Sequence, residues 1–169
     1  MGASPVRYGE AADDGSDGVR QRHTADARLL PSGVHGAWHD GLVSWPPQIG
    51  ELLPRAEDAY GVREKLTRYA LNADHDDGGA KAAGFAAVLG ITAADLEYLA
   101  TALLAGVQEH ATAEVRDRGE HGMHCRVIIP VAGIGERADR VANVRTVWEI
   151  RWEGDAPRLV TAYITTKLV

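Results

Sequence analysis

The hydrophobic positions along the chain follow a helical period first and a strand period afterwards. A first helical run covers 62–72, and a second covers 80–89 and stops at Gly90, a residue type that commonly ends helices. A third run opens where Thr92 and Asp95 have the spacing of a capping box. We therefore expect three helices in the first part of the folded region.

Beyond residue 111 the hydrophobic pattern has a period of two. Residues 143–152 alternate and give the clearest strand, and 126–131 is rich in β-branched residues. Residues 159–166 read as a returning strand after a hairpin connection, and 112–115 is a weaker fourth candidate. The fold class this predicts is α+β: three N-terminal helices followed by a three- to four-stranded antiparallel sheet.

The alternation within 143–152 assigns its side chains to two faces. Trp148 and Trp152 fall on the face with the other large apolar residues, so both are expected in the core. Arg145 falls on the opposite face, which we expect to be exposed or to line a cleft. For Tyr163, on the returning strand, a place in the core and a place in a site both stay open.

The N-terminal part of the chain, 1–50, lacks any sustained period and is interrupted by Gly and Pro. Such a segment buries too little apolar surface to offset its chain entropy, so we expect it to be largely disordered or loosely docked. Residues 42–49 are the exception, because Trp45 and Ile49 could dock on the domain that follows. The predicted organisation is this segment and a single α+β domain over 51–169.

Composition narrows the class of protein. The 169 residues are 45% hydrophobic and 25% charged, as in a folded globular protein, and the net charge is -6. Mild acidity argues against non-specific binding of duplex nucleic acid but leaves room for a local basic cleft. The first residues do not form a signal peptide and no apolar stretch is long enough to cross a bilayer, so we expect a cytoplasmic protein with no membrane partner.

Cysteine and histidine positions give no metal or cofactor site. Cys125 is the single cysteine, so no internal disulfide forms, and we expect it to be a buried small hydrophobe. His121 and His124 are three residues apart, which places them on opposite faces of a strand. Phosphate-binding loops, dinucleotide fingerprints and nucleophile elbows are also missing from the sequence. We predict no cofactor and no metal.

Several short sequence motifs resemble those of an uncharacterised bacterial domain family found at the C-termini of polymorphic and contact-inhibition toxins. The resemblance covers roughly residues 52–164. Its main phrases are Lys65-Leu66-x-x-Tyr69-x-Leu71-Asn72, His75 followed by Gly78-Gly79-x-Lys81-Ala82, Arg145-Thr146-Val147-Trp148 and Pro157-Arg158-Leu159-Val160-Thr161-Ala162-Tyr163. The helices-then-sheet layout is similar to that of the barnase–EndoU–colicin–RelE group of small metal-independent ribonucleases.

This resemblance implies RNA cleavage by general acid–base chemistry, with RNA and a cognate immunity protein as partners. Because the chain begins with Met and has no room for a delivery apparatus, we expect a stand-alone intracellular role. His75 would be the general base or acid, and Lys81 with nearby helix amides would stabilise the charge on the phosphorane. The residues expected to complete the catalytic site are Arg145, Thr146, Arg158, Thr161 and Tyr163.

The same residues also have a structural interpretation, in which they have no catalytic role. His75 could be a turn residue bonded to local backbone, with Lys81 a solvated side chain. Asp74, Asp76 and Asp77 would repel a phosphate next to His75 unless they point away. Whether the domain is an enzyme therefore stays open. The alternative function is a non-catalytic module that uses the sheet face to bind a protein partner or to self-associate.

Overall fold

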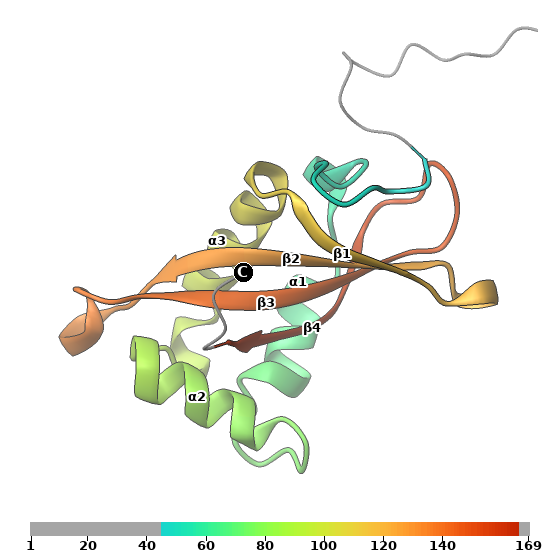
Figure 1. Cartoon of the computed structure of the whole chain (residues 1–169). Coiled ribbons are helices and arrows are strands. Elements are labelled where there is room, and N and C mark those ends of the chain that lie inside the picture. The colour runs from blue at the N-terminus through green and yellow to red at the C-terminus, as the bar shows by residue number, and fades with distance from the viewer. Residues whose placement is uncertain (1–44, 166–169) are drawn as a thin grey trace, which may run out of the picture. The chain divides into compact units, whose positions relative to one another are not determined.

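A computed structural model describes residues 45–165 of the chain. Residues 1–44, and with them most of the predicted N-terminal segment, lie outside the described part. The predicted α+β class is confirmed, and its sheet has four strands (Figure 1). The elements in chain order are α1 (Val62–Lys65), α2 (Gly79–Leu89), α3 (Leu96–Glu109), β1 (Thr112–Asp117), β2 (Met123–Ala132), β3 (Val141–Ile150) and β4 (Arg158–Ile164).

The four strands form one antiparallel sheet in the order β1-β2-β3-β4. Each strand pairs with the next along the chain, which short connections favour. In Figure 1, α1 and α3 lie behind the sheet and α2 lies below β4, and the other face of the sheet is turned toward the viewer. The sheet therefore has a helix-covered face and an open face.

The core lies between the helices and the covered face of the sheet. Phe85 and Leu103 from the helices and Trp148 and Ile129 from the strands are almost completely buried. Gly106 on α3 lets the helix approach β2 closely, because a Cβ at this position would clash with the Ile129 side chain. Burial of this apolar surface supplies the main free energy of folding.

The first helix differs from its predicted form. α1 ends at Lys65 and continues as a π-helical turn over Leu66–Ala70, closed by a 2.9 Å bond from Leu71 N to Leu66 O. A π-turn contains an extra residue, so side chains after it are rotated relative to a regular helix. Tyr69, which lies in the predicted helical run 62–72, is only partly buried.

The end of α2 and the start of α3 follow the predicted signals. Gly90 ends α2 with a left-handed φ of 71°. Thr92 Oγ1 accepts from Ala94 N, and Asp95 accepts from Thr92 N at 2.9 Å, which completes the capping box. No single helix of the described chain is long and apolar enough to cross a membrane. Only α2 and α3 taken as a pair meet the length and composition test, and they are bent by 80°.

The prediction that both tryptophans of the third strand are buried is half wrong. Trp148 is fully buried, but Trp152 is 60% exposed. β3 ends at Ile150, and Asp155 N then donates to Trp152 O at 3.1 Å within the hairpin turn. The strand alternation therefore stops before it reaches Trp152.

Residues 45–50 already pack against this domain. Trp45 is partly buried against the core, whereas Ile49 is 67% exposed. Gly50 N donates to Thr112 O at 2.8 Å, and Thr112 N donates to Glu51 O at 2.7 Å. The chain thus reaches the edge of β1 just before residue 52.

Candidate functional site on the open face of the sheet

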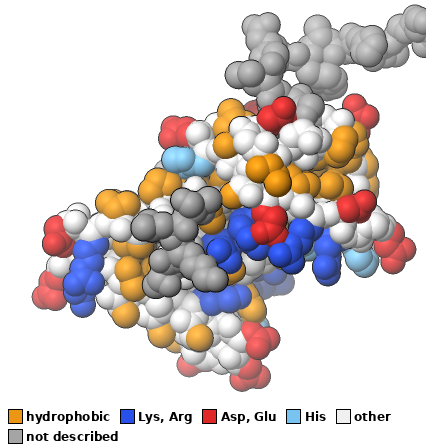
Figure 2. Space-filling view, in the orientation of Figure 1, with side chains coloured by type: hydrophobic (Ala, Val, Ile, Leu, Met, Phe, Trp, Pro, Cys, Tyr) orange, Lys and Arg blue, Asp and Glu red, His pale blue; other side chains and the backbone are white. Residues whose placement is uncertain are grey.

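The polar chemistry of the domain is concentrated on the open face of the sheet. On β2, Cys125 and Val127 point to the core, so His124 and Arg126 point to the open face. His124 is paired in register with Glu149 on β3, which has Arg158 as its partner on β4. Figure 2 shows Lys and Arg side chains gathered across the middle of this face, with acidic side chains among them.

His124 and Glu149 form the centre of one cluster. His124 Nε2 lies 3.9 Å from a carboxylate oxygen of Glu149, and their side chains are only 24% and 11% exposed. Glu149 also accepts hydrogen bonds from Arg151 Nε at 2.7 Å and from an Arg158 amino group at 3.2 Å. A histidine and a carboxylate are thus held side by side under arginine side chains.

The surroundings set the charge of both groups. Burial raises the pKa of Glu149, but hydrogen bonds from Arg151 and Arg158 and the charges of these arginines lower it more, so the carboxyl is ionised at neutral pH. Burial lowers the pKa of the His124 imidazole. The charge of Glu149 offsets this only in part, and Arg118 adds to the lowering. At neutral pH the pair is therefore a carboxylate beside a mainly uncharged imidazole.

A second carboxylate, Glu114, lies on β1 beside the pair. It forms ion pairs with Arg116 and Arg126, and the Nε of Arg126 is buried without a hydrogen-bond partner. A shallow pocket of about 210 Å³ opens here, with His124, Arg116 and Arg126 in its lining. Glu114 lines this pocket as well and pairs with two of its arginines, so Arg118 is the arginine of the lining that has no carboxylate partner among the described residues.

At the β4 edge the structure brings together four of the residues predicted for the site. Arg145 donates to the Tyr163 hydroxyl at 3.3 Å, and Lys81 Nζ lies 3.2 Å from Thr161 Oγ1. Within residues 45–165, neither Arg145 nor Lys81 forms an ion pair with a carboxylate. Among the described residues their positive charges face hydroxyls and aromatic rings, so we treat them as candidate groups for binding an anion.

Thr146 lies apart from these four. Its side chain is fully buried on the covered face of the sheet. Its hydroxyl donates to Val127 O at 2.9 Å and accepts from Trp148 Nε1 at 2.8 Å. Thr146 therefore satisfies the indole N–H of the core and does not line the site for which it was predicted.

His75 forms the contacts expected of a turn residue that is bonded to the local backbone. Its Nδ1 accepts from the backbone N–H groups of Asp77 and Gly78, both at 3.2 Å. Its ring packs edge-on against Tyr69 with the centroids 4.7 Å apart. Because Nδ1 is an acceptor, the neutral ring carries its hydrogen on Nε2. In this geometry His75 can donate a hydrogen bond through Nε2 but cannot accept a proton there.

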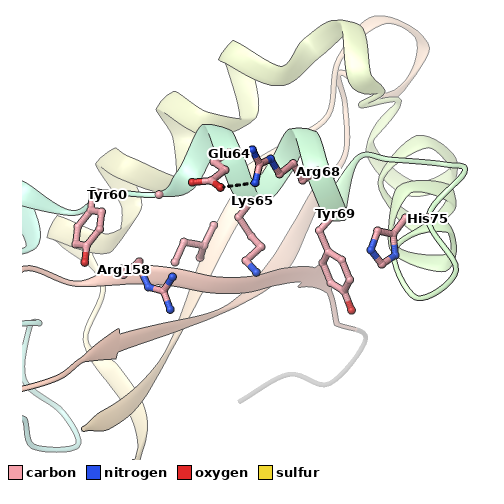
Figure 3. A pocket seen from close by; sticks show the side chains of 9 residues that line it. Tyr60, Glu64, Lys65, Arg68, Tyr69, His75 and Arg158 are labelled. Atoms are coloured by element: carbon pink, nitrogen blue, oxygen red, sulfur yellow. Dashed lines mark ion pairs between the residues drawn. The ribbon is translucent and has the colours of Figure 1, made fainter. Parts of the chain in front are cut away.

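A larger pocket of about 400 Å³ lies between α1 and the beginning of β4 (Figure 3). Tyr60 stands at one end, and Tyr69 and His75 stand at the other. Lys65 and Arg158 lie between them, so two basic side chains stand between aromatic side chains along the pocket. Arg158 belongs to both this pocket and the arginine set around Glu149.

The described residues contain no group of three or more His, Cys, Asp or Glu side chains placed to hold a metal ion. Cys125 is fully buried, as predicted, and burial raises the pKa of its thiol to about 12. It is therefore a packing residue without nucleophilic character at neutral pH.

Sequence reasoning considered His124 only as a metal ligand and did not single out Glu149 or Arg126. The signal that finds them is the same alternation that placed Arg145 opposite Trp148. Extended along both strands, it puts His124 and Glu149 on the open face. Their side-by-side position depends on strand register, which the sequence does not fix until the hairpin length is known.

A family model with the description "Domain of unknown function (DUF6883)" matches residues 52–166, well over half of the chain. No curated protein and no solved structure matches the chain.

Proposed function

This chain belongs to the DUF6883 family, and we propose that it is a toxin-like domain that cleaves RNA without a metal ion. The observation that supports the proposal most is the His124–Glu149 pair, 3.9 Å apart on a basic open face. Its position differs from the one expected from the sequence, which centred the acid–base chemistry on His75.

Each group of the pair has a role in RNA cleavage. The Glu149 carboxylate takes the proton of a 2′-hydroxyl, and the freed oxygen attacks the adjacent phosphorus. His124 in its protonated form gives a proton to the departing 5′-oxygen, which leaves a 2′,3′-cyclic phosphate and a free 5′-hydroxyl. General acid–base groups of this kind typically contribute about 10²–10⁴-fold each.

Cationic side chains around the pair supply the electrostatic part of catalysis. Arg126 and Arg158 flank it, and each has a buried Nε without a hydrogen-bond partner in the described structure. Arg145 and Lys81 lie at the β4 edge without a carboxylate partner among residues 45–165. Positive groups fixed before the reaction stabilise the charge that builds up on the phosphorane.

The proposal is tested with His124→Ala and Glu149→Gln in an assay of single-stranded RNA cleavage. Each change should lower the rate by about 10²-fold or more, and the wild-type rate should survive EDTA. Arg63→Ala is the matched control, because Arg63 pairs with Glu97 on α3 and touches neither group. Melting curves distinguish lost chemistry from lost folding. Absence of cleavage and of toxicity for the wild-type protein would contradict the proposal.

One observation favours the alternative of a non-catalytic binding module. Much of the open face is already paired within itself, since Glu114 binds Arg116 and Arg126, and Glu149 binds Arg151 and Arg158. Such a network could be a fixed surface for a protein partner, a cognate immunity protein or a second copy of the chain. Unchanged growth on expression, together with concentration-dependent association in sedimentation, would support this alternative.

A further inference from the structure

The 400 Å³ pocket between α1 and β4 has walls that are fixed by the backbone. Tyr60 N donates to Pro157 O and Leu159 N donates to Tyr60 O, both at 3.0 Å, so Tyr60 is held against β4. The opposite wall is α1 and the π-helical turn that carries Tyr69. The volume falls in the range of pockets that bind small ligands.

The lining combines flat aromatic rings with cations. Tyr60 is 47% exposed, which leaves a ring available for stacking. Lys65 Nζ lies 5.6 Å from the centre of the Tyr69 ring and forms no ion pair with any carboxylate of the described chain. The neighbouring Glu64 pairs with Arg68 at 2.9 Å and so does not neutralise Lys65 (Figure 3). A ligand that fits has an aromatic ring and a negative charge.

The pocket is joined to the acid–base pair through one side chain. Arg158 lines the pocket and also donates to Glu149 at 3.2 Å. A ligand bound between Tyr60 and Lys65 is therefore adjacent to the carboxylate that is proposed to act as the base. This is where a nucleotide next to the cleaved bond would lie.

From these contacts we infer that the pocket binds one unpaired nucleotide, its base against Tyr60 and its phosphate between Lys65 and Arg158. The inference rests on the proposed function for its assignment to an RNA chain. Stacking on an aromatic side chain requires a base that is free of its partner strand, so the substrate class is single-stranded RNA. The half-exposed tyrosine and the lysine accept any base, so the site selects for single strands more than for sequence.

Two probes that cannot be cleaved test this inference apart from catalysis. The first is AMP, which has no phosphodiester bond, and the second is a 2′-O-methyl RNA hexamer, in which the attacking hydroxyl is blocked. Binding is measured by calorimetry with inorganic phosphate and adenosine as reference ligands. We expect both probes to bind, and AMP to bind more tightly than phosphate or adenosine.

One variant tests the contact with the base of the ligand, and a second tests the contact with its phosphate. Tyr60→Leu and Lys65→Ala should each weaken binding about tenfold, the loss typical of one stacked base or one phosphate contact. Arg63→Ala is the matched control on the same helix, since Arg63 lies outside the pocket and pairs with Glu97. Both positions are at least partly exposed, so melting curves should stay unchanged.

The outcomes separate this inference from the proposed function. Binding that is about tenfold weaker in each of the two variants but unchanged in His124→Ala supports the pocket even if no RNA is cleaved. Phosphate binding as tightly as AMP, or affinities unaffected by both variants, overturns the pocket even if cleavage is observed. Binding of AMP without the hexamer overturns the assignment to an RNA chain.

Discussion

At the residue scale, the polar atoms of His75 and Trp148 both form hydrogen bonds inside the fold. His75 faces two backbone amides through Nδ1, and Trp148 donates its indole N–H to Thr146. Each of these hydrogen bonds joins groups within the domain, and none of them involves a residue of the proposed acid–base pair. Their substitution should therefore affect stability before it affects chemistry.

For His75 we expect a loss of stability that a short acceptor side chain restores. His75→Ala removes the side-chain acceptor of the Asp77 and Gly78 amides, while Gly78 N keeps its 3.1 Å bond to the backbone oxygen of residue 75, so the free energy of unfolding should fall by about 0.5–1.5 kcal/mol. His75→Asn should recover part of this, because an Asn side chain accepts from the backbone of the same kind of turn. Urea denaturation measures both. Unchanged stability with abolished RNA cleavage would instead make His75 catalytic.

For Trp148 and Trp152 we expect opposite results from the same substitution. Trp148→Ala should lower the free energy of unfolding by about 3–5 kcal/mol, because it empties a fully buried position. Trp152→Ala should change it by less than about 0.5 kcal/mol, because that side chain is 60% exposed. Chemical denaturation followed by circular dichroism compares the two. Equal costs would show that the hairpin packs differently from the structure described.

At the element scale, strand pairing creates the site. Neither β2 nor β3 carries an acid–base pair by itself, and only their antiparallel register places His124 beside Glu149. The positive side chains that face His124 come from several places, with Arg118 before β2 and Arg158 on β4. The charges of these arginines lower the pKa of His124, and His121 lowers it further.

This arrangement predicts an acidic optimum for RNA cleavage. The general acid must be protonated, and burial together with Arg118 lowers the pKa of His124 below its ordinary value of 6.5. The general base must be ionised, and its arginine partners outweigh burial and lower the pKa of Glu149 below 4.5. The value of kcat/KM should therefore be highest between these two lowered pKa values and fall toward neutral pH. A profile that rises through pH 7 would contradict these roles.

The helices and strands themselves were largely predictable from the sequence. The capping box at Thr92 and the Gly90 stop marked helix ends correctly because both signals are local. The π-helical turn at Leu66–Ala70 was missed, since a 3.6-residue period does not distinguish it from a regular helix. The prediction that Trp152 is buried was wrong, because the alternation of side chains does not reveal where a strand ends.

The candidate site was less predictable than the fold. Arg145, Lys81, Thr161 and Tyr163 do come together, as their family phrases implied, although they lie on three elements. The alternation that placed Arg145 on the open face also places its neighbour Thr146 on the buried face, so the position of Thr146 was predictable. The pairing of His124 with Glu149 required the register of two strands, a long-range property that residue types alone do not encode.

At the scale of the whole molecule, the described domain begins with a segment that contacts both outer strands. Residues 50 and 51 pair with Thr112 at the start of β1. Tyr60 forms an isolated parallel bridge with Arg158 at the start of β4, where Leu159 N donates to Tyr60 O. The chain between these contacts is only about ten residues long, yet it reaches from one edge of the sheet to the other.

We expect the residues before this segment to be dispensable for stability. Deletion of residues 1–40 removes a stretch without any apolar period, so the melting temperature should stay within a few degrees of the full chain. Differential scanning calorimetry of both proteins tests this. A large decrease would show that the deleted stretch is docked and that the predicted boundary at residue 50 is misplaced.

The contacts of residues 50–60 with β1 and β4 have a consequence for aggregation of the protein. A strand with unpaired amides and carbonyls recruits a similar strand from another molecule, and repetition of this step leads to aggregation. In this domain one short segment covers the start of β1 and the start of β4, so removal of the whole segment would expose both edges. Deletion through residue 61, which also removes the buried side chains of Leu53 and Ala56, should therefore give a protein whose light scattering rises with time although all four strands of the sheet are present.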